Sequence, residues 1–106
     1  MNGSLQQILN DLHLGLNAIY GAQLEKVVLY GSYARGEAGP ESDIDILIVL
    51  RGEVRYGEEI RRVVPLTADL SLQNNILISC AFTSSKDYAT SENSLLANVR
   101  REGKEV

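Results

Sequence analysis

The sequence VVLYGSYARGEAGPESDIDILIVL, residues 27–50, contains two apolar runs joined by a polar segment that is rich in glycine. The first run ends at Gly31-Ser32, and the second opens with the aspartates Asp43 and Asp45. Branched and aromatic side chains favour strands, whereas glycine and serine favour the turns that join them. The stretch therefore predicts a strand, a tight turn, a polar loop and a second strand.

The two aspartates stand one residue apart at the start of the second run. Side chains alternate between the faces of a strand, so Asp43 and Asp45 point the same way, roughly 6–7 Å apart at the backbone. Like charges this close repel unless a cation lies between them, and carboxylates with phosphate oxygens suit Mg²⁺. The pair thus predicts a metal site, although two acids at a strand start are also common as solvent-facing residues.

The turn after the first strand has the residues expected of a phosphate site. Gly31 lets the backbone approach a bulky anion, and Ser32 adds a hydroxyl group. Arg35 can add a charge-assisted contact, and Ser42, just before the aspartates, is a further candidate nucleotide contact. Gly-Ser after a strand is also typical of a plain turn, as is Pro40-Glu41-Ser42, and Arg35 alone also fits a solvated surface charge.

The rest of the chain predicts the elements that surround this stretch. Apolar residues at helical spacing indicate a helix over Leu5–Tyr20, with Ser4 as its N-cap. The first strand is expected over Lys26–Tyr30 and the second over Ile44–Leu50. A helix follows over residues 56–74, kinked or broken at Pro65.

A third strand is expected over Ile76–Phe82, then a turn and a polar loop over Tyr88–Glu92. A last helix is expected over Asn93–Arg101, ended by Gly103. The residues that follow Gly103 are expected to be mobile. The order is α-β-β-α-β-α. This predicts an α/β (α+β) fold with a small mixed sheet flanked by helices.

Composition limits the class of protein. The chain has 106 residues, a net charge of −4 and one cysteine, Cys80. We expect one domain over residues 1–106, without an internal disulfide. The acidic balance argues against sequence-independent binding to nucleic acid. The start MNGSLQQ lacks the features of a signal peptide, and no apolar run approaches the ~20 residues that span a bilayer, so a cytoplasmic protein is expected.

The stretch GSYARGEAGPESDID resembles the signature of the nucleotidyltransferase superfamily that includes DNA polymerase beta: Gly-Ser, a spacer, then Asp-x-Asp. Gly31, Ser32, Asp43 and Asp45 match it. The short chain looks most like the minimal nucleotidyltransferases, which are often antitoxin partners of HEPN-domain toxins. The resemblance implies the nucleotidyltransferase fold, Mg²⁺ on the two aspartates (two ions with bound nucleotide), and contacts from Gly31 and Ser32 to a nucleoside triphosphate, with ATP as the default. It also implies a HEPN-type toxin as partner.

The sequence departs from that superfamily at one position. Its enzymes generally use a third carboxylate on a neighbouring strand, and the expected third strand contains no acid. Asn75, just before this strand, could take the position, but an amide cannot accept a proton as a carboxylate does. Ser79 is a weaker substitute, and Asp69 falls within a predicted helix.

Three interpretations remain open. The first is an enzyme that transfers AMP from ATP to a hydroxyl group, such as a tyrosine of a HEPN-type toxin. The second is a binding module with a weakened site, which acts as an antitoxin by direct contact with its partner. The third is a subunit associated with nucleic acid, which the acidic balance disfavours. A homo-oligomer or hetero-oligomer fits each of them.

Overall fold

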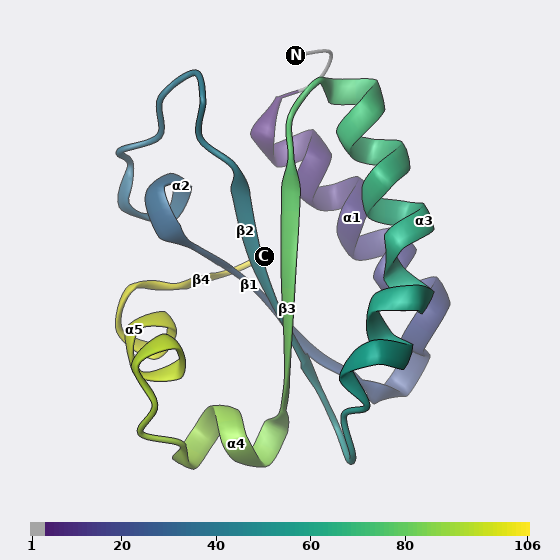
Figure 1. Cartoon of the computed structure of the whole chain (residues 1–106), viewed down its shortest axis with the longest axis vertical. Helices are drawn as coiled ribbons and strands as arrows, with labels where there is room; N and C mark the ends of the chain where they lie inside the picture. The colour runs from purple at the N-terminus through teal and green to yellow at the C-terminus, as the bar shows by residue number, and fades with distance from the viewer. Residues whose placement is uncertain (1–3) are drawn as a thin grey trace.

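A computed structural model describes residues 4–106 and shows a four-stranded mixed sheet with helices on both faces (Figure 1). The predicted fold class is confirmed, and the six predicted elements occur in the predicted order. The predicted domain also includes residues 1–3, which lie outside the described residues. The elements are α1 (Leu5–Tyr20), η1 (Gly21–Gln23), β1 (Leu24–Tyr30), α2 (Gly31–Arg35), β2 (Ile44–Leu50), α3 (Tyr56–Asn74), β3 (Ile78–Ser84), α4 (Ser85–Thr90), α5 (Ser94–Glu102) and β4 (Lys104–Glu105).

The sheet has the strand order β3-β2-β1-β4. Strand β2 runs antiparallel to β1, so these two strands pair across the polar loop as the sequence predicts. Strand β3 runs parallel to β2, which requires a crossover, and α3 provides it. Strand β3 therefore pairs with β2 alone, and β4 pairs with the other edge of β1.

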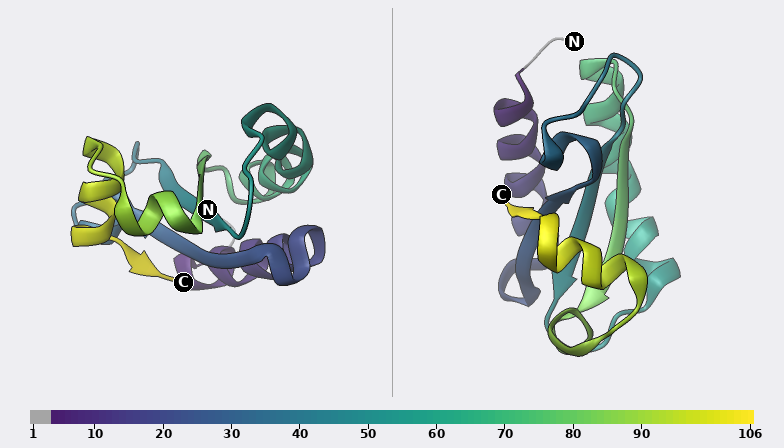
Figure 2. Two further views of the ribbon diagram at one scale, coloured as in Figure 1. Left: turned by 90° about the horizontal axis from the view of Figure 1, so that it is seen from below. Right: turned by 90° about the vertical axis from the view of Figure 1, so that its left-hand side faces the viewer.

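Strand β2 is apolar on both faces because both faces are covered. Ile44, Ile46 and Ile48 face the larger core, which α1 and α3 complete, whereas Leu47 and Val49 face a smaller core under α5. Figure 2 shows α1 and α3 on one side of the strands and α5 on the other. Because the second face is only partly covered by short helices, it leaves room for a site at one end of β2.

A kink or a break was predicted at Pro65; helix α3 runs unbroken through this residue, so a break does not occur. The helix ends where Asn75 adopts the left-handed conformation, with φ of 52°. The N–H of Ile76 donates to the C=O of Ser71, and the N–H of Ile78 donates to the Ser71 hydroxyl. These bonds tie the connection to the helix end, so β3 starts two residues later than the sequence predicts.

The C-terminal part differs most from the predictions. Residues expected to form a polar loop belong partly to α4, where the Ser84 side chain accepts from the N–H of Asp87 and caps the helix. The residues after Gly103 were expected to be mobile, but Lys104–Glu105 form β4 and pair with β1. A Cβ on Gly103 would collide with the side chain of Val28, so only glycine lets the chain pass this close to β1.

None of the helices described over residues 4–106 is long and apolar enough to cross a membrane.

Candidate functional site

The two aspartates lie at the start of β2, on the face of the sheet that α5 partly covers. Asp45 is half-buried and pairs in register with Tyr30 on β1 and Ser79 on β3. Asp43 precedes the strand and is exposed. Residues directly opposite one another in a sheet project to the same face, so Asp45 lies between the side chains of Tyr30 and Ser79.

Gly31 brings the turn of the signature against the second aspartate. It follows β1, opens α2 and has a φ of 73°. A Cβ at this position would collide with Oδ2 of Asp45, so a side chain is excluded both by the backbone conformation and by the carboxylate. The structure thus joins the two halves of the sequence signature, 14 positions apart in the chain, into one site.

The surroundings of the pair disfavour the ionised form of Asp45. Burial raises the pKa of Asp45, the nearby charge of Asp43 raises it further, and Arg35 opposes this rise. Within residues 4–106, no three His, Cys, Asp or Glu side chains group so as to hold a metal ion. Two carboxylates that need positive charge, beside a turn open to phosphate, nevertheless fit Mg²⁺, which takes further oxygen ligands from substrate and water.

The raised pKa of Asp45 predicts a pH dependence of stability. A raised folded-state pKa means that the ionised carboxylate costs folding free energy, and this cost disappears as the pH falls through that pKa. We expect Asp45→Asn to unfold at a higher temperature than the wild type at neutral pH. The difference should shrink on acidification and on addition of Mg²⁺, as measured by thermal unfolding. A difference independent of pH would contradict this assignment.

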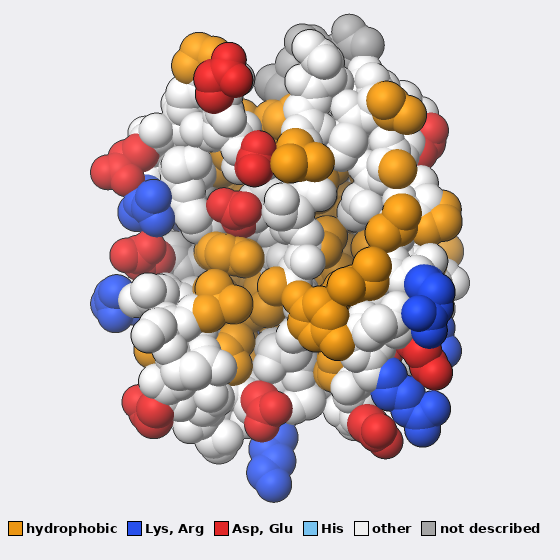
Figure 3. Space-filling view, in the orientation of Figure 1, with side chains coloured by type: hydrophobic (Ala, Val, Ile, Leu, Met, Phe, Trp, Pro, Cys, Tyr) orange, Lys and Arg blue, Asp and Glu red, His pale blue; other side chains and the backbone are white. Residues whose placement is uncertain are grey.

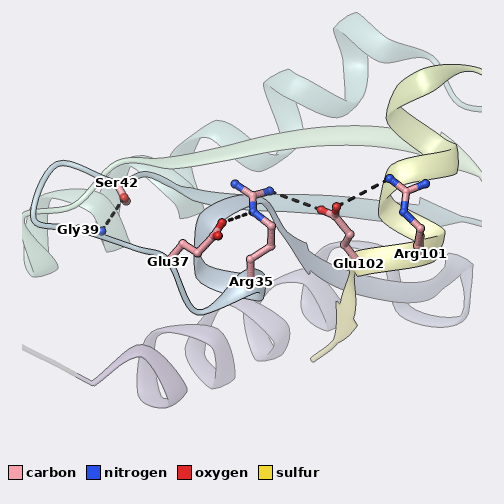
Figure 4. Close-up of polar contacts among 6 residues, drawn as sticks. All are labelled: Arg35, Glu37, Gly39, Ser42, Arg101 and Glu102. Atoms are coloured by element: carbon pink, nitrogen blue, oxygen red, sulfur yellow. Dashed lines mark hydrogen bonds and ion pairs between the residues drawn. The ribbon is translucent and has the colours of Figure 1, made fainter.

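Helix α2 places the exposed side chain of Arg35 beside two glutamates (Figure 4). Its Nε lies 2.6 Å from Oε1 of Glu37, and its Nη1 lies 3.4 Å from Oε2 of Glu102 on α5. Arg101 also contacts Glu102, at 3.8 Å. The hydrogen bond from Arg35 to Glu37 is the main reason that the pKa of Arg35 is raised. Arg35 stays fully charged, and a phosphate that binds it would compete with the exposed carboxylate of Glu37 and the half-buried carboxylate of Glu102.

The two serines of the site differ in their surroundings. Ser32 is the second residue of α2, half-buried and directly next to Gly31. The Ser42 hydroxyl accepts from the N–H of Gly39 at 2.9 Å, and the N–H of Ser42 donates to the C=O of Gly39 at 3.1 Å (Figure 4). Ser42 therefore closes the turn of the loop, which is the plainer of its two predicted roles.

Ser79 is the β3 residue in register with Asp45. Asn75 is not on the strand, because it caps α3 three residues before β3 begins. The residue next to Asp43 is Leu77, whose C=O accepts from the N–H of Ile44. Ser79 rather than Asn75 is thus the neighbour that a third acid would replace.

Sequence reasoning missed the residues that α5 brings to this face. A cavity of about 240 Å³ lies between the end of β1, α2 and α5. Its lining includes Gly31 and Arg35 from the signature together with Leu95, Asn98 and Glu102 from α5. The spacing of apolar residues predicts α5 as a helix, but only the tertiary fold shows that it borders the site.

Comparisons with known proteins identify the family of the chain. Residues 14–94 match the family described as nucleotidyltransferase domain. MJ0604 of Methanocaldococcus jannaschii, provisionally named a protein adenylyltransferase, is 37% identical over 90 residues that cover 84% of each chain.

Two solved structures share the fold at low sequence identity. One is a toxin–antitoxin with AMP-PNP, with a TM-score of 0.63 and 18% identity over 96% of this chain and 72% of that one. The other is a tri-AMPylated Shewanella oneidensis HEPN toxin in complex with an MNT antitoxin, with a TM-score of 0.56 and 19% identity over 94% of this chain and 69% of that one. With the family match over most of the chain, the signature residues and the shared fold lead to one conclusion: the chain belongs to the nucleotidyltransferase domain family.

Proposed function

We propose that this nucleotidyltransferase-domain protein transfers AMP from ATP to a hydroxyl group of another protein, with Mg²⁺ at the aspartate pair. The observation that carries the proposal is the close approach of Gly31 to Asp45: a Cβ at Gly31 would collide with Oδ2 of Asp45, so the Gly-Ser turn lies directly against this carboxylate. A triphosphate on this turn would have its reacting phosphate beside Asp43 and Asp45.

The transfer requires positioning more than covalent chemistry from the protein. The acceptor oxygen bonds to the α-phosphorus, the bond from this phosphorus to the bridging oxygen breaks, pyrophosphate leaves and the hydroxyl proton passes to solvent. Asp43 and Asp45 would hold Mg²⁺, which when bound offsets the negative charge that develops on the phosphate. Gly31 and Ser32 would bind the triphosphate, and Arg35 would orient its outer oxygens.

Similarity to proteins of known name indicates the class of acceptor. The related M. jannaschii protein is named for adenylyl transfer to protein, and one structural neighbour is an antitoxin beside an AMPylated HEPN toxin. We infer that the acceptor of this chain is a protein hydroxyl, with a tyrosine of a HEPN-type toxin as the leading candidate.

The test is the intact mass of the co-expressed partner after incubation with ATP and Mg²⁺. The proposal expects a gain of one or more AMP groups on a tyrosine of the partner, and no gain with EDTA. Tight, metal-dependent ATP binding without any gain of mass on chain or partner would instead support a second candidate function.

The second candidate is a binding module that keeps the nucleotide site but acts by direct contact with its partner. Ser79 favours this candidate, because it stands where a third carboxylate would activate the acceptor. A serine hydroxyl neither carries the charge that holds a second metal nor accepts a proton as a carboxylate does.

A further inference from the structure

We propose that the nucleoside of ATP binds in the channel between α5 and the sheet, over Leu95 and Leu47. This inference rests on the proposed function, since it places the rest of the molecule whose phosphates Gly31 and the aspartates would hold. It assigns a subsite to residues outside the Gly-Ser and Asp-x-Asp signature.

Two cavities meet at α5. The first, described above, contains Gly31 and Arg35 and forms the phosphate end. The second has a volume of about 320 Å³ and lies farther along the same sheet face, where Leu47, Thr83 and α5 border it. Leu95 lines both cavities. Ligand pockets usually measure about 300–1,000 Å³, so the first cavity alone is small for a nucleotide, whereas the two together are sufficient.

Strand β2 runs from the aspartate pair, where the reacting phosphate would lie, toward the second cavity. Asp45 and Leu47 are two residues apart and project to the same face, which separates them by about 7 Å along the strand. A ribose separates a base from its α-phosphate by a comparable length. An α-phosphate beside Asp45 would therefore place its base over Leu47 and in the second cavity.

The charged residues that line each cavity indicate which end of ATP, the phosphates or the base, each cavity would bind. Arg35 and Glu102 both line the first cavity and form an ion pair at 3.4 Å, so this cavity holds the guanidinium that a phosphate could contact in place of Glu102. Among the residues described, 4–106, no lysine or arginine lines the second cavity, and its one charged lining residue is Asp87, which would repel a phosphate. Its lining combines the exposed Leu95 with the hydroxyl and amide groups of Thr83, Ser84, Ser91 and Asn93, whereas Leu47 and Leu96 are buried beneath it. An uncharged, flat group with a polar edge, such as a nucleobase, matches this arrangement.

Leu95 is exposed although it stands beside the smaller core. Helix α5 buries Leu96 and Val99 in the smaller core, whereas the side chain of Leu95 is 43% exposed beside them. Figure 3 shows apolar side chains gathered in the shallow depression between α5 and β3, below the acidic side chains near the start of β2. A bound nucleoside would cover the exposed side chain of Leu95.

The experiment compares ATP with inorganic triphosphate, both with Mg²⁺, by calorimetric titration of the full chain and of Leu95→Ala. We expect Leu95→Ala to weaken ATP binding about tenfold, the loss expected for one large apolar contact, and to leave triphosphate binding unchanged. The matched control is Leu72→Ala on α3, where the leucine is 84% exposed and lines neither cavity. It should change neither affinity.

Each remaining result overturns the inference in a distinct way. Equal affinity of the wild type for ATP and triphosphate would show that the nucleoside makes no contact, while the phosphate site of the proposed function stands. A Leu95→Ala variant that binds ATP normally but transfers AMP more slowly would assign the channel to the acceptor instead. A wild type that binds neither ligand would refute the proposed function as well.

Discussion

Replacing Asp43 and Asp45 together by asparagine is expected to abolish Mg²⁺-dependent ATP binding while the chain stays folded. The affinity should fall by more than about 100-fold, because two contacts to ionised groups, each worth roughly 1.5–3 kcal/mol, are removed. The fold should not suffer, since the half-buried Asp45 carries a pKa raised by burial and by Asp43, and asparagine removes this unfavourable charge. Calorimetric titration and thermal unfolding measure the two effects.

The control for this double variant is the replacement of Asp11 and Asp69 by asparagine. Both are exposed aspartates, on α1 and α3, so the change in net charge is the same and lies outside the site. ATP affinity should stay at the wild-type value. An unchanged affinity in the Asp43→Asn, Asp45→Asn variant would place the nucleotide elsewhere and refute the site.

Introducing an aspartate at Ser79 is expected to raise the rate of AMP transfer by about 100-fold or more, the usual contribution of a positioned proton acceptor. Ser79 is half-buried and in register with Asp45, so the new carboxylate would lie on the same face as the existing pair. Three carboxylates this close repel. Ser79→Asp should therefore unfold at a lower temperature than the wild type without metal and recover with Mg²⁺. Single-turnover transfer and thermal unfolding are the readouts.

Ser79→Asn serves as the matched variant, because asparagine has the shape of aspartate without its charge or basicity. It should neither accelerate transfer nor respond to Mg²⁺ more than the wild type. If Ser79→Asp and Ser79→Asn transfer AMP equally, the position beside Asp45 does not limit the reaction. The lack of a third carboxylate would then give no support to the binding-module function.

The elements β2 and α1 could be predicted from the sequence because each depends on a pattern of neighbouring residues. Strand β2 matches the prediction at both ends, as does α1, since each follows from a single pattern of apolar residues. The proximity of Gly31 and Asp45 also follows from a local pattern: β1 and β2 pair across one loop, so residues at the facing ends must meet. The nucleotide roles of Gly31, Ser32, Arg35 and Ser42 stay predictions.

The parts that were missed depend on contacts between distant segments. Strand β4 is two residues long and exists because it pairs with β1, so no periodicity could show it. The start of β3 is set by bonds from the connection to Ser71, which turn chemistry alone does not show. Leu95 appears in the sequence as an ordinary core residue of a helix, and only its place above β2 reveals its exposure.

The central claim is that Gly31 and the aspartate pair form one metal-dependent nucleotide site. Calorimetric titration of the full chain with ATP, once with Mg²⁺ and once with EDTA, tests it most directly. The account predicts saturable binding of one ATP per chain with Mg²⁺ and at least a tenfold weaker affinity with EDTA. Equal affinity under both conditions, or no binding with Mg²⁺, would contradict it.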